Sequence, residues 1–135
     1  MEIETNYPYV ASDGTCAYKE TGDVLVSKFT DVTPNSPSAL AAAVAEGPVS
    51  IAIDAGGIFF QLYTSGIMKN FCYTSLDHGV LLVGYGSENG EDYWIVKNSW
   101  GAGWGEKGFF RILKSMEEGK PGVCGVQMDP SYPEF

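Results

Sequence analysis

A single histidine is the first residue of this chain that could carry out chemistry. His78 lies in Leu76-Asp77-His78-Gly79, directly before the apolar run Val80–Val83. An imidazole gains and loses protons near neutral pH, so His78 is a candidate general base and general acid. Asp77 precedes it, and a neighbouring carboxylate favours a protonated imidazole. A lone histidine is more often a hydrogen-bonded structural residue, and this segment alone leaves both interpretations open.

A segment rich in tryptophan and glycine holds the second candidate group. Six of the eight residues in Asn98–Gly105 are Trp, Gly or Asn. A catalytic imidazole needs a further group to orient it, and the side-chain oxygen of Asn98 could make that contact with His78. Trp100 would then keep water away from the bond. The alternative is an aromatic structural loop, in which glycine lets the backbone pass close to the indole rings.

Two strands must lie side by side to bring these groups together. The apolar and β-branched runs Val80–Val83 and Tyr93–Lys97 are typical of strands, and Ser87–Gly90 predicts a hairpin turn between them. An antiparallel pair places the end of one strand beside the start of its neighbour. The pairing therefore predicts that Asn98 lies next to His78.

The remaining elements predict an α+β fold. Ser36 and Pro37 are typical of the start of a helix, which Gly47-Pro48 would end. Further strands are expected at Val24–Phe29, Pro48–Asp54 and Phe109–Leu113, with a short helix at Ile58–Tyr63. One helix followed by strands with short connections predicts an antiparallel sheet or partial barrel.

Composition excludes several classes of protein. The 135 residues include 17 acidic and 8 basic side chains, and the net charge of −9 argues against nucleic acid and anionic membranes as partners. No apolar run approaches the roughly 18 residues of a membrane span. Three cysteines and one histidine without a Cys-x-x-Cys pair do not fit a zinc site, so no metal or cofactor is expected. Gly103–Gly108 matches the dinucleotide fingerprint in letters only, because Trp104 occupies its turn and a strand follows.

The histidine and asparagine motifs together resemble those of the papain-like cysteine peptidases, in the branch of plant papain and cathepsin L. Asp77-His78-Gly79 and Asn98–Phe109 occur in that family's order, and other segments match its landmarks: Tyr7-Pro8-Tyr9, Gly47-Pro48-Val49-Ser50, Phe60-Gln61-Leu62-Tyr63, Gly122-Val123-Cys124-Gly125 and Ser131-Tyr132-Pro133. The resemblance implies the β-rich right domain of the papain fold over residues 31–125, which carries the catalytic His and Asn. Residues 1–30 would be a remnant of the helical left domain, and residues 126–135 a tail that crosses back to it.

The resemblance also implies a role for each candidate residue. His78 would form a thiolate–imidazolium pair and later protonate the leaving amine. Asn98 would hold the imidazole, and Trp100 would shield that bond and line the leaving-group side of the cleft. Asp77 would support this site, and the cleft would be lined by Ala52, Leu76, Asp77 and Gly79.

Asp129 falls where the family places the floor of the pocket for the second substrate residue. An acid there implies that Arg or Lys is tolerated beside the usual bulky apolar residue. From the residues alone, a solvated turn acid in Met128-Asp129-Pro130 is the favoured alternative.

The chain has three cysteines, and they bear on both its disulfides and its missing nucleophile. The count alone suggests one disulfide and one odd cysteine. The resemblance implies a Cys72–Cys124 disulfide and a partner for Cys16 outside this chain. The family's nucleophile lies in a Gln…Cys-Gly-Ser-Cys-Trp segment that has no counterpart here. The chain is therefore expected to be the C-terminal part of a peptidase, inactive by itself, with a missing N-terminal half or light chain supplying the nucleophile.

Two functions remain open at this point. The first is a cysteine endopeptidase acting on peptide or protein substrates through a thiolate–imidazolium pair. The second is a non-catalytic papain-fold module that binds or supports another protein, since a fold does not guarantee a function. The expected disulfide suits a lysosome, a vacuole or the secreted space.

Overall fold

The computed structural model describes residues 3–18 and 24–135. The chain divides into two compact units, one of residues 1–30 with 133–135 and one of residues 31–132. Residues 1–2 and 19–23 of the predicted left-domain remnant lie outside the described residues. The predicted domain boundaries stay a prediction.

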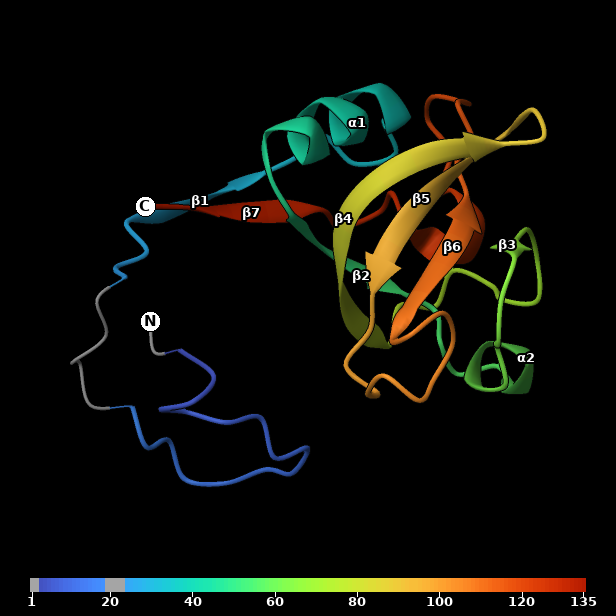
Figure 1. The fold of residues 1–135 in the computed structure, drawn as a ribbon. Coiled ribbons are helices and arrows are strands. Elements are labelled where there is room, and N and C mark those ends of the chain that lie inside the picture. The colour runs from blue at the N-terminus through green and yellow to red at the C-terminus, as the bar shows by residue number, and fades with distance from the viewer. Residues whose placement is uncertain (1–2, 19–23) are drawn as a thin grey trace. The chain divides into compact units, whose positions relative to one another are not determined.

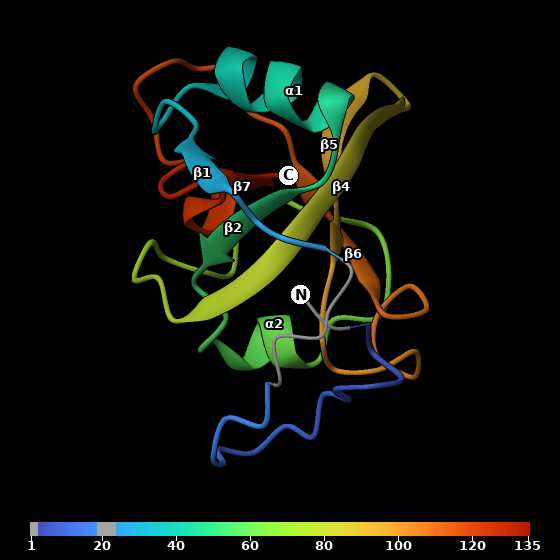
Figure 2. The ribbon, with the colours of Figure 1, turned by 90° about the vertical axis from the view of Figure 1, so that its left-hand side faces the viewer.

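The fold is α+β, as expected, with few helices and a seven-stranded sheet. The strands are β1 (Lys28–Asp31), β2 (Val49–Ile53), β3 (Ile67–Met68), β4 (His78–Glu88), β5 (Glu91–Lys97), β6 (Phe109–Leu113) and β7 (Ser131–Glu134), in the order β1-β7-β2-β4-β5-β6-β3. The helices are α1 (Pro37–Glu46), α2 (Ile58–Gln61) and the 3-10 turn η1 (Val123–Gly125). Strands β4, β5 and β6 lie side by side, and α1 packs against β4 (Figures 1 and 2). The sheet is mixed rather than antiparallel throughout, because β3 runs parallel to β6.

Several predicted elements agree with the structure and others do not. The strand Phe109–Leu113 and the helix capped by Ser36 are confirmed, and the Ser36 side chain accepts a hydrogen bond from the main-chain N–H of Ala39. The strand predicted at Val24–Phe29 is wrong over its first four residues, because β1 begins only at Lys28. Two strands were not predicted: β3 has only two residues, and β7 contains Pro133, whose missing N–H argues against a strand.

A tight hairpin turn sets the register between β4 and β5. Asn89 and Gly90 have φ angles of 54° and 81°, the left-handed conformation that the favoured two-residue hairpin turn requires. Glu88 faces Glu91 at the turn, and Leu81 faces Lys97 further along. This register brings the start of β4 and the end of β5 to the same end of the sheet.

The core lies on one face of the sheet and under α1. Buried side chains alternate along β2, β5 and β6, as the two-residue period of a strand requires. The largest fully buried apolar side chains are Leu40, Val49, Ile51, Ile53, Phe60, Leu82, Trp94, Val96, Phe110, Ile112 and Val126. This packed layer supports the strand ends at which the candidate residues lie.

The expected disulfide joins Cys72 to Cys124, 52 residues apart. Cys72 lies in the segment before β4, and the buried Cys124 belongs to η1. The main-chain N–H of Asp54 donates to the carbonyl of Cys124, so the end of β2 is attached to the same point. Cys16 is a free, exposed thiol.

We expect loss of this disulfide to lower the free energy of unfolding by about 4 kcal/mol, since a cross-link of this span restricts the unfolded chain. Urea unfolding of Cys72→Ser, with and without reductant, measures the change. The matched control is Cys16→Ser, which removes the free thiol and should unfold like the parent chain. Equal stability of Cys72→Ser and the parent would contradict the prediction.

Candidate active site

The structure brings His78 and Asn98 into direct contact. Nε2 of His78 lies 2.8 Å from Oδ1 of Asn98. The same oxygen accepts a hydrogen bond of 2.8 Å from the main-chain N–H of Ser99, which fixes Oδ1 rather than Nδ2 on this side of the amide. Nε2 must therefore carry the proton, and the neutral ring keeps its lone pair on Nδ1. The imidazole is held in the tautomer that a general base needs.

The sheet positions both side chains. His78 is the first residue of β4, where it faces Ile53 of β2, and Asn98 directly follows β5. Asn98 is 6 % exposed, so its bond to the ring is shielded from water. Its Nδ2 atom is buried without a hydrogen-bond partner among the described residues. The predicted proximity of the two groups follows from the antiparallel pairing of β4 with β5.

Trp100 lies against the imidazole. The two ring centres are 5.1 Å apart, and Trp100 makes edge contacts with Phe60 and Trp104 at 5.5 and 5.1 Å. The indole N–H of Trp104 donates to the carbonyl of Gln61. The segment Asn98–Gly105 is thus an aromatic structural loop, and it also places Asn98 in contact with His78. The two interpretations that the sequence left open for this segment are both correct.

Glycine permits this loop to close on itself. The main-chain N–H of Asn98 donates to the carbonyl of Gly108, which joins the two ends of the loop. Gly105 has a φ of 56°, and a Cβ there would lie 2.6 Å from the carbonyl oxygen of Phe109. A larger residue would push the loop away from β6.

An ion pair attaches the loop to β6. Nε and Nη2 of Arg111 each lie 2.9 Å from a carboxylate oxygen of Glu106, and Nη1 lies 2.8 Å from Glu88. Glu106 also accepts a hydrogen bond of 2.8 Å from the main-chain N–H of Gly66. The hydrogen bonds from Arg111 lower the pKa of Glu106, and those bonds in turn raise the pKa of Arg111. Burial raises the pKa of Tyr63, whose hydroxyl donates to Gly66 beside this pair.

The other predicted residues are placed less closely around the imidazole. Ala52 and Gly79 face each other one step along β2 and β4 from the Ile53–His78 pair. The exposed Asp77 directs its carboxylate to the main-chain N–H of Ala55 at 2.8 Å and not to the ring.

Leu76 lies against η1, since a Cβ on Gly125 would approach its Cδ2 atom to 2.7 Å. Asp129 is exposed in the segment before β7. The cleft and pocket roles of these residues stay predictions.

Sequence reasoning missed three charged residues that support the site. Asp54, Glu106 and Arg111 contact main-chain or charged groups of other segments. An acid directly after the apolar strand Val49–Ile53 was the one available signal, for Asp54. The local sequence carries no signal for the pairing of Glu106 with Arg111, because that pairing depends on how the turn between them folds.

No metal site and no membrane span emerge from the described residues. Within residues 3–18 and 24–135, no cluster of three His, Cys, Asp or Glu side chains could hold a metal ion. Within the same ranges, none of the helices combines the length and apolar character needed to cross a bilayer.

Comparison with known proteins shows the family. Residues 1–134 match the papain family of cysteine proteases, and the chain belongs to that family. It is 48% identical over 135 residues to the probable cysteine protease RD21B of Arabidopsis thaliana, covering 98% of this chain and 29% of that protein. It is 50% identical over 135 residues to the oryzain beta chain of Oryza sativa subsp. japonica, again covering 98% of this chain and 29% of the relative.

A solved structure agrees with this assignment. Bromelain from Ananas comosus, in complex with the inhibitor E64, matches with a TM-score of 0.89 at 39% identity, covering 99% of this chain and 62% of bromelain. The chain thus corresponds to the C-terminal portion of a papain-like cysteine peptidase. It spans about three tenths of the length of the curated relatives named above.

We expect Asn98→Ala to release the imidazole. Because His78 is the only histidine, selective ¹⁵N-histidine labelling gives one imidazole spectrum. The parent chain should show the Nε2–H tautomer, and the variant a mixture of both tautomers. Ser99→Ala is the matched control, since it removes the hydroxyl of the adjacent residue and keeps the main-chain N–H that binds Oδ1 of Asn98. A single Nε2–H tautomer in Asn98→Ala would contradict the geometry.

Glu106→Gln should destabilise the chain in a pH-dependent way. The folded-state pKa of Glu106 is lowered, so its stabilising effect is present above the ordinary value of 4.5 and is lost as the pH falls through the folded value. We expect a loss of about 2 kcal/mol at neutral pH, the scale of hydrogen bonds to charged groups. The difference from the parent should shrink in acid. Urea unfolding across pH 3 to 7 measures it.

The control for this variant is Glu88→Gln. Glu88 contacts the same Arg111, but its side chain is 52% exposed against 26% for Glu106. Exposed ion pairs contribute little, so its effect should be the smaller of the two. A pH-independent loss in Glu106→Gln would show that the charge is not what stabilises the fold.

Proposed function

We propose that this chain is the part of a papain-like endopeptidase that carries the catalytic base and its orienting asparagine. Together with a segment that bears the nucleophilic cysteine, it hydrolyses peptide bonds in proteins. The observation that carries the proposal is the hydrogen bond from Nε2 of His78 to Oδ1 of Asn98, which leaves Nδ1 free to take a proton.

The geometry supports a defined sequence of proton transfers. Nδ1 of His78 takes the proton of the cysteine thiol, which gives a thiolate and an imidazolium. The thiolate adds to the substrate carbonyl carbon, and the imidazolium returns its proton to the leaving amine as the C–N bond breaks. A water molecule then loses a proton to Nδ1 and attacks the acyl group, which releases the acid and restores the thiol. Asn98 holds the ring through every step.

The nucleophile has to come from another segment. Cys72 and Cys124 are joined to each other, so neither holds a free thiol. We propose that Cys16 pairs with a cysteine of the missing N-terminal half or light chain. The greater length of the relatives supports such a segment. Without it the chain lacks the covalent step and the donors that stabilise an oxyanion, so we propose that it is inactive alone.

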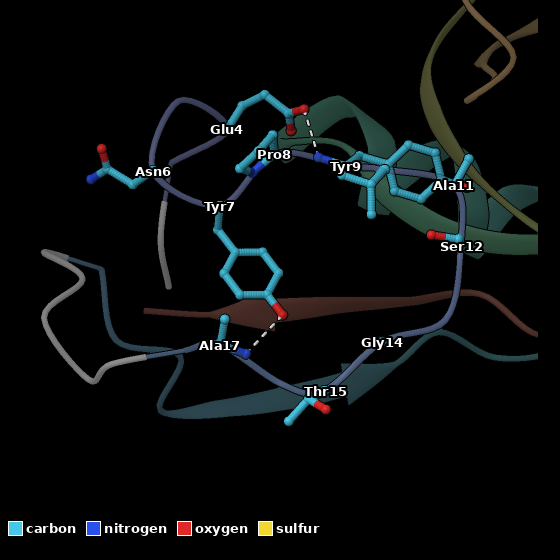
Figure 3. Close-up of a pocket in the computed structure, with 11 residues that line it drawn as sticks. Glu4, Asn6, Tyr7, Pro8, Tyr9, Ala11, Ser12, Gly14, Thr15 and Ala17 are labelled. Carbon is cyan, nitrogen blue, oxygen red and sulfur yellow. Dashed lines mark hydrogen bonds between the residues drawn. The ribbon is translucent and has the colours of Figure 1, made fainter.

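The first unit has the surface that such a segment would cover. Its exposed apolar side chains include Ile3, Tyr9, Val10, Leu25 and Phe29, each more than 60% exposed. Residues between Glu4 and Ala17 of this unit line a hollow of about 470 Å³. Figure 3 shows the ring of Tyr7 pointing across it to Ala17, where the Tyr7 hydroxyl accepts a hydrogen bond from the main-chain N–H. These exposed apolar side chains support the proposal that a further segment covers this unit.

The proposed substrate contacts follow the strand ends around His78. Trp100 is 41% exposed and would line the leaving-group side. Ala52, Leu76 and Gly79 would line the cleft, and Asp77 would support it. An acid at Asp129 would let the pocket for the second substrate residue accept Arg or Lys. The disulfide supports a location in the vacuole, the lysosome or the secreted space.

A complementation experiment tests this function. The chain is refolded with the part of RD21B that precedes the matched region, and the mixture is treated with a peptide-like epoxide that alkylates activated thiols. We expect the label on a cysteine of the RD21B part and cleavage of a fluorogenic peptide. Both should fall by at least about a hundredfold with His78→Ala, the scale of a lost general base.

The isolated chain and the isolated RD21B part are the controls, and neither should take the label. A stable complex of the two that takes no label would contradict the proposal and favour the non-catalytic module. Hydrolysis by the isolated chain would contradict the proposed separation of base and nucleophile.

A further inference from the structure

We propose that the buried carboxylate of Asp54 is a positioning residue for His78, acting through the segment that leads into β4. The inference deepens the proposed function, and its catalytic meaning rests on that function. Asp54 directly follows β2 and is 7% exposed. A buried carboxylate needs hydrogen bonds to offset the loss of water, and the groups that supply them here belong to the approach to the histidine.

The carboxylate binds the main chain of that approach. Oδ2 of Asp54 accepts hydrogen bonds from the main-chain N–H groups of Tyr73 at 2.9 Å and Ser75 at 3.4 Å. Hydrogen bonds to an ionised acceptor are roughly twice as strong as neutral ones. Tyr73 and Ser75 have exposed side chains, so their main-chain N–H groups are what attach these two residues to the protein.

The same stretch is tied back to β2 at its other end. The main-chain N–H of Asp77 donates to the carbonyl of Ile53, and the carboxylate of Asp77 accepts from the N–H of Ala55 at 2.8 Å. Ile53 also faces His78 across the sheet. Residues 53–55 and 73–77 therefore exchange hydrogen bonds in both directions, immediately before the imidazole.

The carboxylates of Asp54 and Asp77 pack closely where residues 53–55 meet residues 73–77, next to Gly56. A Cβ on Gly56 would lie 2.8 Å from Oδ2 of Asp77 and 4.0 Å from Oδ1 of Asp54. The disulfide of Cys72 constrains the start of the stretch, but four residues lie between Cys72 and Asp77 in the sequence. Asp54 is the side chain that holds the middle of this stretch.

The imidazole spectrum of the single histidine provides the test. We expect Asp54→Ala to lose the single Nε2–H tautomer and to exchange the ring proton at least about tenfold faster, the factor expected for losing hydrogen bonds to a charged acceptor. Asp54→Asn keeps an amide oxygen for the same N–H groups and should restore most of the parent spectrum. A role in stability alone would lower the unfolding midpoint and leave the ring of the folded state unchanged.

Glu118→Ala is the matched control. Glu118 also accepts hydrogen bonds from a distant segment, the N–H and hydroxyl of Ser38, which lies at the start of α1. Its removal should leave the imidazole spectrum unchanged. A parent-like spectrum in folded Asp54→Ala, or an equal change in Glu118→Ala, overturns the proposal.

Asp54→Glu is used if Asp54→Ala does not fold. It keeps the charge and shifts the acceptor by one methylene, so the same change in smaller degree is expected, and a parent-like ring overturns the proposal. Failure of the proposed function gives a different result. The complex with the RD21B part would then not be labelled by the epoxide, while the imidazole spectrum would still change in the Asp54 variants. If only the positioning role fails, the complex is still labelled and the imidazole spectrum is the same in the parent chain and in the Asp54 variants.

Discussion

The hydrogen bond between His78 and Asn98 exists because the start of β4 and the end of β5 lie at the same end of the sheet. Oδ1 of Asn98 accepts from both the imidazole and the N–H of Ser99, so the orientation of the amide and the tautomer of the ring are set together. The pairing of β4 with β5 and the left-handed turn at Asn89-Gly90 fix the register that this contact needs. The buried aromatic and aliphatic layer beneath holds the strands in place.

The stretch before His78 and the loop after Asn98 are irregular, and both are attached to the sheet by carboxylates. The loop after Asn98 closes through the Gly108 carbonyl and is joined to β6 by the ion pair of Glu106 with Arg111. The stretch before His78 is bound by Asp54 and by the disulfide at Cys72. Irregular backbone has no repeating hydrogen bonds of its own, so side chains supply them.

In the proposed enzyme, this chain carries the base and a further segment carries the nucleophile. The second unit holds the imidazole, the amide and the shielding indole within one packed sheet. The first unit exposes apolar side chains and a pocket lined by residues between Glu4 and Ala17. A further segment would cover this surface in the proposed enzyme. The chain belongs to the papain family and spans about three tenths of the length of the curated relatives named above.

The sequence by itself determined the α+β class, the strand Phe109–Leu113, the capped helix α1 and the hairpin turn, because each depends on neighbouring residues. The family motifs also predicted the disulfide between Cys72 and Cys124. Only the tertiary structure decided the parallel β3, the late start of β1, the strand β7 despite Pro133, and the contacts of Asp54, Glu106 and Arg111. Most of those features are set by partners far away in the chain, such as Gly66 for Glu106 and Glu88 for Arg111, while the pairing of Glu106 with Arg111 depends on how the turn between them folds. A strand or a buried charge is stable only where folding brings such a partner within hydrogen-bond distance.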